Sequence, residues 1–373
     1  MFFILEQYKK ELIALADSHH LIPYDFDIQF SSPSRMRELQ SRGYAKRPYK
    51  IPDSNESFYI AELYDFIGVN RLYLNEYNNH SLNLLAIAHA IGHADFIKHN
   101  KWINQRAFRL NQIIEHGNDI DFYETDKLNF INKLLTLSKH IMMTEEFANQ
   151  YINKRDGINL IDYLLHEEFP LKTWEKTLLR LIRSEALVFE MTYRTKIMNE
   201  GWACYYQMPL LKSSSIDQDE LLRIIINESE LYRHYRYGIN PYTLGKSIWS
   251  EVPDVLKRQV MKNFTDYEFI QKYYTEAVHN QEQISIIDGD LLVDEFHKVK
   301  ANLLKSAALG DQVVLTVDQQ LTSPPNELVL RHTPKSSNPH SLKTIKTLLQ
   351  SLLNMKVYLK ASRLQKSTIT NYS

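Results

Sequence analysis

Residues 81–100 read SLNLLAIAHAIGHADFIKHN and are apolar on most faces of a helix as far as Asp95. A helix that is apolar nearly all round is typical of a protein interior, so the sequence predicts a buried helix here. His89 and His93 are four residues apart, which places both imidazoles on one face of that helix. Gly92 lies between them, although glycine costs about 1 kcal/mol inside a helix. We therefore expect Gly92 to mark a close approach of another backbone.

The composition around this helix indicates a mainly helical protein. The chain has 373 residues with only 10 glycines and 12 prolines, so long helices meet few breakers. The 44 basic and 45 acidic residues give a net charge of −1, which argues against a nucleic-acid binder. The glycine-rich motifs that cradle phosphates are missing from the sequence. The single cysteine, Cys204, excludes a disulfide within the chain.

The sequence contains no targeting or membrane signal that we recognise. No run of about 18 apolar residues is present, so no membrane span is predicted. Residues 2–5 form only a short apolar run before Lys9, which does not resemble a signal peptide. We therefore expect a cytoplasmic protein.

Hydrophobic periodicity predicts a large multi-helix domain over residues 1–286. The pattern changes after this point, where three strand-like segments and one helical segment follow, at 312–317, 327–332, 340–354 and 356–361. The expected fold class is mainly α, with a small α+β module of β-β-α-β order at residues 287–366. Residues 367–373 form a polar tail.

The spacing of His89 and His93 is the one by which a helix supplies two ligands to zinc in the HExxH motif. Ala90 stands where that motif has its catalytic glutamate, so a metal-activated water would need a base from elsewhere. Asp95 is placed to orient a ligand. Two histidines in a buried helix are equally compatible with a structural role, each bonded to backbone or to a carboxylate.

A second motif, TKIMNEGWA at residues 195–203, places Glu200 in an otherwise largely apolar helix. A carboxylate there is costly unless it is paired or bound to a metal. A glutamate from a second helix is the usual third ligand of a His2Glu zinc site. A salt bridge to Lys196 is the structural alternative. Three neighbours in the motif are expected to support the site or the packing: Asn199, Gly201 and Trp202.

Weaker candidates lie elsewhere in the sequence. Glu115 and His116 can provide a base and a ligand, or simply end a helix before Gly117. Glu185 is a further carboxylate. Asn240 and Tyr242, in the segment NPYTLG, indicate a turn into a helix and are expected to be supporting or structural residues. Cys204 follows an apolar run and is predicted to be an inert core thiol.

In this order the motifs resemble those of the SpoVR family, named for a stage V sporulation protein. The resemblance is carried by HAIGHADFIKHN (89–100), RSEALVFEMTYRTKIMNEGWACYY (183–206), INPYTLG (239–245), DYEFIQKYYT (266–275) and LVLRH (328–332). The segment RPYKIPDSNESF (47–58) departs from the family pattern, because it lacks the family's HW-containing segment. The resemblance implies a bacterial cytoplasmic protein of spore-cortex formation or stress response. As partners it implies a AAA+ serine-kinase-like protein and a von Willebrand A-like protein.

Two functions remain open from the sequence. In the first, the protein is a metal-dependent hydrolase in which His89 and His93, completed by Glu200 or His116, bind one divalent ion, zinc before others. Glu200 is then also a candidate catalytic carboxylate, with Glu115 or Glu185 as the base. In the second, the protein is a non-catalytic interaction protein whose histidines and glutamate form a buried polar network.

Overall fold

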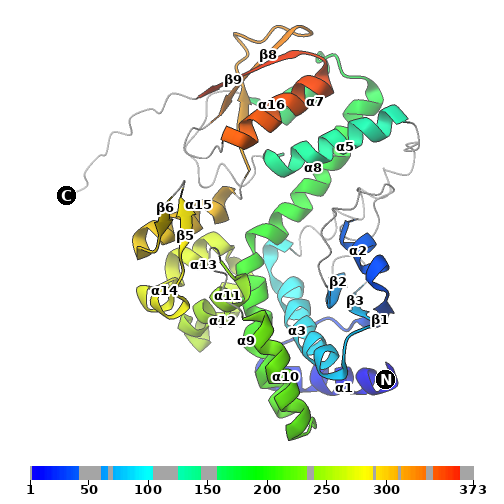
Figure 1. The fold of residues 1–373 in the computed structure, drawn as a ribbon, viewed down its shortest axis with the longest axis vertical. Helices are drawn as coiled ribbons and strands as arrows, with labels where there is room; N and C mark the ends of the chain where they lie inside the picture. Colours follow the sequence, from blue (N-terminus) through cyan, green and yellow to red (C-terminus); the bar gives the residue numbers. More distant parts are fainter. Residues whose placement is uncertain are drawn as a thin grey trace, which may run out of the picture. The chain divides into compact units, whose positions relative to one another are not determined.

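The computed structural model describes residues 2–41, 60–65, 70–103, 125–143, 158–232, 239–288, 291–309, 312–332 and 339–361. Helices dominate these residues, which confirms the expected mainly α class (Figure 1). The chain forms two compact units. The first consists of Met1–Asp119 and Val188–Ala307, and the second of Ile120–Leu187 and Ala308–Ser373.

The first unit contains most of the described helices and two small sheets. Its helices are α1 (Phe2–Ala16), α2 (Pro33–Ser41), α3 (His80–His99), α9 (Lys196–Ser213), α10 (Gln218–Leu231), α11 (Pro241–Glu251), α12 (Asp254–Asn263), α13 (Asp266–Tyr273), α14 (Glu276–Glu282) and most of α15 (Phe296–Leu309). Its strands are β1 (Asp27–Ser31), β2 (Glu62–Asp65), β3 (Arg71–Asn75), β5 (Ile286–Asp288) and β6 (Leu291–Val293). β5 and β6 pair with each other in an antiparallel hairpin.

The other sheet of this unit has the order β1-β3-β2, with β1 parallel and β2 antiparallel to β3. Successive side chains of a strand point to opposite faces. Leu63 accordingly packs on one face against Met36, Leu39 and Tyr73. Glu62 and Tyr64, one residue to either side, share the opposite face.

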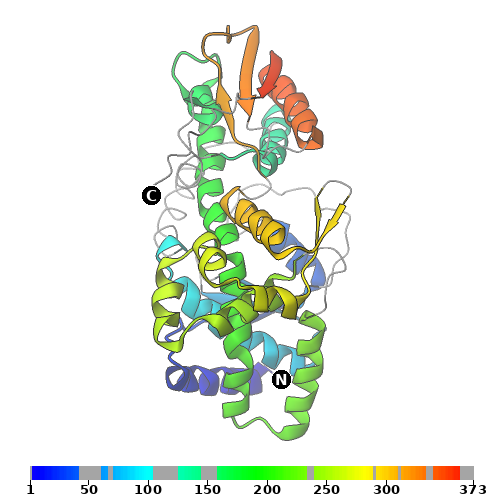
Figure 2. The ribbon, with the colours of Figure 1, turned by 90° about the vertical axis from the view of Figure 1, so that its left-hand side faces the viewer.

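α3 follows β3 after a short turn and is the predicted buried helix. The side chain of Asn79 accepts a hydrogen bond from the Leu82 backbone N–H at 2.7 Å, which caps the helix N-terminus. Sixteen of its residues, including both histidines, are buried. The helix is covered by α1, α9, α10 and α12, and Figure 2 shows α9 and α10 as the two green helices that are joined at the bottom of the view.

α9 lies in backbone contact with a helix on either side. A β-carbon on Gly92 of α3 would lie 2.5 Å from the Ala203 Cα of α9. A β-carbon on Gly201 would overlap the backbone of Gly245 in α11, and one on Gly245 would overlap the Ile197 carbonyl oxygen. Both motif glycines thus mark close helix contacts as expected, but Gly201 faces α11 rather than α3.

The start of α9 is fixed by a buried carboxylate from α13. Asp266 accepts hydrogen bonds from the backbone N–H groups of Ile197 and Met198, both at 2.9 Å. These donors would otherwise have no partner within the helix. Asp266 therefore sets where α9 begins, and with it the position of every side chain on that helix.

The second unit contains a four-stranded sheet of order β4-β7-β8-β9. Its elements are α5 (Thr125–His140), β4 (Ile158–Asn159), α7 (Leu160–Leu165), most of α8 (Thr173–Arg194), β7 (Leu315–Val317), β8 (Glu327–His332), α16 (Pro339–Leu353) and β9 (Lys356–Ala361). β7 pairs antiparallel with β4 and β8, and β8 pairs parallel with β9.

The expected β-β-α-β module is not seen as a separate piece of chain. Residues 291–307 belong to the first unit, and the sheet of the second unit gains β4 from residues 158–159. The reason is that β7 is fully buried, so it needs a neighbour on both edges and cover from α7. The compact units alternate along the chain, whereas the expected boundaries at 286 and 366 divide it into consecutive pieces.

The glycine contacts give a first prediction. Gly201→Ala and Gly245→Ala should each lower the free energy of unfolding by about 1–3 kcal/mol, because the added methyl group overlaps backbone that cannot rotate away. Chemical denaturation measures this. Lys212→Ala, at an exposed position of α9, is the control. Unchanged stability in both glycine variants would show that the helices are not in backbone contact.

Candidate functional site

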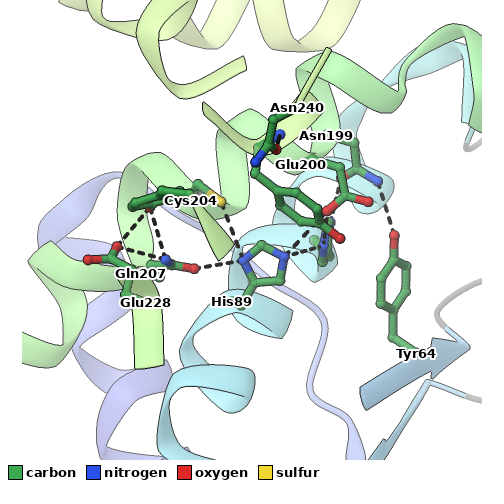
Figure 3. Close-up of polar contacts among 11 residues, drawn as sticks. Tyr64, His89, Asn199, Glu200, Cys204, Gln207, Glu228 and Asn240 are labelled. Atoms are coloured by element: carbon green, nitrogen blue, oxygen red, sulfur yellow. Dashed lines mark hydrogen bonds and ion pairs between the residues drawn. The ribbon is translucent and has the colours of Figure 1, made fainter. Parts of the chain in front are cut away.

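Three side chains of α3 and α9 converge on one point in the first unit (Figure 3). The Nε2 atoms of His89 and His93 are 3.0 Å apart. Glu200 Oε2 lies 3.4 Å from His89 Nε2 and 3.3 Å from His93 Nε2. Both histidine side chains are buried, and that of Glu200 is 13% exposed. These three residues form the single group in the described part of the chain whose ligand atoms could hold a metal ion.

Amide side chains on α9 fix which nitrogen of each histidine faces this point. His89 Nδ1 lies 2.7 Å from Gln207 Oε1, and His93 Nδ1 lies 2.9 Å from Asn199 Oδ1. An amide oxygen only accepts hydrogen bonds, so each Nδ1 carries the proton and donates. Both Nε2 lone pairs are therefore left facing Glu200.

Further contacts hold those amides in the required orientation. Gln207 Nε2 donates to Glu228 Oε1 at 2.8 Å and to the Tyr232 hydroxyl at 3.2 Å. The Tyr232 hydroxyl also donates to Glu228 and accepts from Lys246 Nζ at 3.0 Å. A carboxylate accepts only, so Glu228 requires the Gln207 amide to turn its oxygen toward His89.

Two imidazole lone pairs and a carboxylate oxygen this close repel one another unless a cation lies between them. In a tetrahedral zinc site with bonds of about 2.0–2.1 Å, ligand atoms are about 3.3 Å apart. The three observed separations of 3.0, 3.3 and 3.4 Å are close to this value. A proton shared between the histidines is the other cation that this geometry accepts.

The ionisation of the cluster follows from its burial and its charges. Burial opposes ionisation of Glu200, but the imidazoles of His93 and His89 outweigh burial and lower its pKa. Burial also lowers the pKa of His93. At His89 burial acts in the same direction, but Cys204, Glu200 and Glu62 outweigh it and raise its pKa. The cluster thus pairs an ionised carboxylate with a site prepared for positive charge.

Two residues of β2, Glu62 and Tyr64, lie beside the cluster. The Tyr64 ring stacks on His93 with centroids 4.3 Å apart. The Tyr64 hydroxyl accepts a hydrogen bond from Asn199 Nδ2 at 3.5 Å, as Figure 3 shows. Glu62 interacts electrostatically with His89 and Glu200, and burial raises its pKa to about 7. Among the described residues, its buried Oε2 atom has no hydrogen-bond partner.

Two asparagines, one at the end of β3 and one in the turn after it, hold the chain that leads into β2. Asn75 Nδ2 donates to the Ile60 carbonyl at 2.8 Å, and Asn78 Nδ2 donates to the Ala61 carbonyl at 2.9 Å. Both asparagines are buried. Because Ile60 and Ala61 directly precede Glu62, these bonds position its carboxyl group relative to α3.

The other described residues that the sequence analysis singled out are not part of the His-His-Glu cluster. Asp95 accepts from Arg258, from the Ile22 backbone and from Trp202 Nε1, so it joins α3 to α12, to the segment after α1 and to α9. Asn240 caps α11 by accepting from the Tyr242 backbone N–H at 2.9 Å. The Tyr242 ring lies 5.9 Å from that of His89. Glu115 and His116 lie outside the described residues.

Sequence reasoning missed Glu62, Tyr64, Gln207 and Glu228. A signal for Gln207 existed, because Glu200, Cys204 and Gln207 recur at helical spacing on one face of α9. Cys204, expected to be an inert core thiol, is buried and its Sγ lies 3.9 Å from His89 Nδ1.

The fold and the site define a mainly helical protein with a buried His-His-Glu cluster between two helices. The chain belongs to the SpoVR family, since the family model described as "SpoVR like protein" matches residues 104–310. The match includes Glu200 and begins after the helix that carries His89 and His93.

One curated relative is similar to part of the chain. It is the uncharacterized protein YcgB of Escherichia coli (strain K12), 22% identical over 162 residues. These residues are 34% of this chain and 32% of YcgB, so the similarity spans about a third of that relative's length. No solved structure matches the chain significantly. Within the described residues, every helix is too short or too polar to cross a membrane.

Glu62 gives a prediction on stability and pH. The pKa of Glu62 is raised from 4.5 to about 7 in the folded protein, so the native state holds this proton more tightly than the unfolded chain does. The free energy of unfolding therefore falls as pH rises from about 4 to 7. In metal-free protein, Glu62→Gln should therefore raise the melting temperature at pH 8 and change it little at pH 4.5. The effect at pH 8 corresponds to at most about 3 kcal/mol.

Thermal melts of both proteins at the two pH values measure this. Glu76→Gln, at an exposed position, is the control and should behave like wild type at both. A Glu62→Gln protein that is less stable than wild type at pH 8 would contradict the burial of an unpartnered carboxyl.

Proposed function

We propose that this SpoVR family member is a metal-dependent hydrolase. One divalent cation, with zinc the best match, binds between α3 and α9 through His89 Nε2, His93 Nε2 and Glu200. The observation that carries the proposal is the triangle of acceptor atoms with edges of 3.0–3.4 Å, formed by lone pairs that the neighbouring amides aim inward. Two histidines and one glutamate are the donor set of hydrolytic zinc sites, which leave one position for water or substrate.

The surrounding residues fit the needs of such a site. Ligating histidines in metalloproteins donate their second N–H to an oxygen acceptor, which fixes the ring and raises the basicity of the ligand. Gln207 and Asn199 do this here for His89 and His93. A bound cation polarises a substrate carbonyl and lowers the pKa of a bound water. The chain's own part is to hold the three ligand side chains in a largely buried setting.

The family name supports a role in sporulation, with spore-cortex formation or a bacterial stress response as the setting we propose. A cytoplasmic location and the two expected partners, a AAA+ serine-kinase-like protein and a von Willebrand A-like protein, belong to the same proposal. They rest on the resemblance to the family.

A second candidate function is that of a non-catalytic interaction protein. The separation of 3.0 Å between the two Nε2 atoms is also a hydrogen-bond length, and the raised pKa of His89 favours an imidazolium that donates to His93. In that case a proton replaces the metal ion, and the cluster serves to join α3 to α9.

Metal binding separates the two functions. Isothermal titration calorimetry of chelator-treated protein with zinc chloride should give one site per chain, and zinc should raise the melting temperature. His89→Ala and Glu200→Gln should weaken binding at least about 100-fold, since each removes one of three ligands. His166→Ala, an exposed histidine, is the control for non-specific binding. A wild type that binds no zinc and whose melting temperature zinc leaves unchanged would favour the interaction protein.

Gln207 gives a further prediction on the same titration. Gln207→Leu keeps the size of the side chain but removes the acceptor of the His89 Nδ1 proton, so zinc affinity should fall about 10–100-fold. Leu222→Gln, on an exposed part of α10, is a control substitution that leaves this hydrogen bond in place. Wild-type affinity in Gln207→Leu would show that the amide does not position His89.

A further inference from the structure

The helix motif lacks a base, because Ala90 occupies the place of the HExxH glutamate. The structure brings a carboxylate to the same cluster from another element. We propose that Glu62 of β2 is the general base of the site, the group that takes the proton from the attacking water. This inference rests on the proposed hydrolase function, and it assigns a role to a residue that is far in sequence from both helix motifs.

The place of Glu62 on β2 suits this role. It shares a face of β2 with Tyr64, whose ring stacks on His93, so its side chain is directed toward the histidines. It interacts electrostatically with His89 and Glu200 but is not one of the three residues whose ligand atoms converge. A carboxylate beside the ligands, rather than among them, is where a water-activating base is needed.

Its hydrogen bonding supports the same role. Glu62 Oε2 is buried and unpartnered among the described residues, which costs free energy that a purely structural carboxyl would avoid. Glu228 is already engaged by Gln207 and Tyr232, and Asp95 by Arg258 and Trp202. Glu62 is thus the acidic side chain facing the cluster that retains an acceptor for a water molecule.

The chemistry that this arrangement fits is hydrolysis of a carbonyl compound, an ester or an amide. Glu62 accepts one proton from water as the water oxygen forms a bond to the carbonyl carbon. The π electron pair of the substrate's C=O bond moves to the carbonyl oxygen. When this intermediate collapses, the bond to the leaving alcohol or amine breaks. Glu62 returns its proton to that leaving group, so water is the only co-reactant.

Asn75 and Asn78 supply the rigidity that a base requires. They tie the two carbonyls before Glu62 to the turn that begins α3. Asn78 also donates to Asn83 Oδ1 within α3 at 2.9 Å. The base and the two histidines are therefore fixed to one local framework, although they lie 27 and 31 residues apart in sequence.

The test uses the zinc-loaded full chain and 4-nitrophenyl acetate, an activated ester whose hydrolysis reports on the activation of water. Zinc content and hydrolysis rate are measured for wild type, Glu62→Gln and Glu62→Ala, with Glu76→Gln as the control at an exposed position. Glu62→Gln should bind one zinc per chain as wild type does, and its rate should fall at least about 100-fold. Added formate should restore part of the rate of Glu62→Ala, which a structural role would not explain.

The contrary outcomes are distinct. A zinc-loaded Glu62→Gln protein with the wild-type rate, or a zinc-loaded wild type with no rate above free zinc, would overturn Glu62 as the base and leave the metal site standing. Loss of zinc from Glu62→Gln would make Glu62 a ligand instead. A wild type that binds no zinc would overturn the proposed function itself, and the base with it.

Discussion

The contact of α9 with α3 and α11 at backbone distance is the constraint on which the site depends. Gly92 meets Ala203 on one side, and Gly201 meets Gly245 on the other, with no room for a further methyl group at any of these glycines. These contacts fix the rotation of α9 about its axis and its position along that axis. Glu200 Oε2 therefore lies 3.3–3.4 Å from the Nε2 atoms of the two histidines of α3. Asp266 adds a fixed starting point for the helix. A looser helix pair would leave the three ligand atoms too far apart to share one cation.

That close packing brings two imidazole nitrogens and a carboxylate oxygen together in a buried site, where they repel one another unless a cation lies between them. Asn199 and Gln207 fix both imidazoles with their lone pairs inward, and Glu200 adds a negative charge in a site largely shielded from water. Burying such a group of acceptors is unfavourable without a positive partner. Whether that partner is a metal ion or a proton decides between a hydrolase and an interaction protein, because both use the same geometry.

The helices and the first three site residues could be predicted from sequence because their signals are local. The i, i+4 spacing of His89 and His93 puts them on one face of any helix, and Glu200 stands out as a lone carboxylate in an apolar segment. Glu62 could not be found in this way, because its approach to the histidines depends on the pairing of β2 with β3 and on hydrogen bonds from Asn75 and Asn78. The pairing of β4 with the C-terminal strands could not be predicted for the same reason, since β4 joins β7 across more than 150 residues.

Anomalous X-ray diffraction from crystals of the zinc-loaded protein, recorded above and below the zinc absorption edge, tests whether a metal ion lies between α3 and α9. We expect one strong peak about 2 Å from His89 Nε2, His93 Nε2 and a carboxylate oxygen of Glu200. The absence of a peak at this point, with the two histidines still in contact at hydrogen-bond distance, would contradict it.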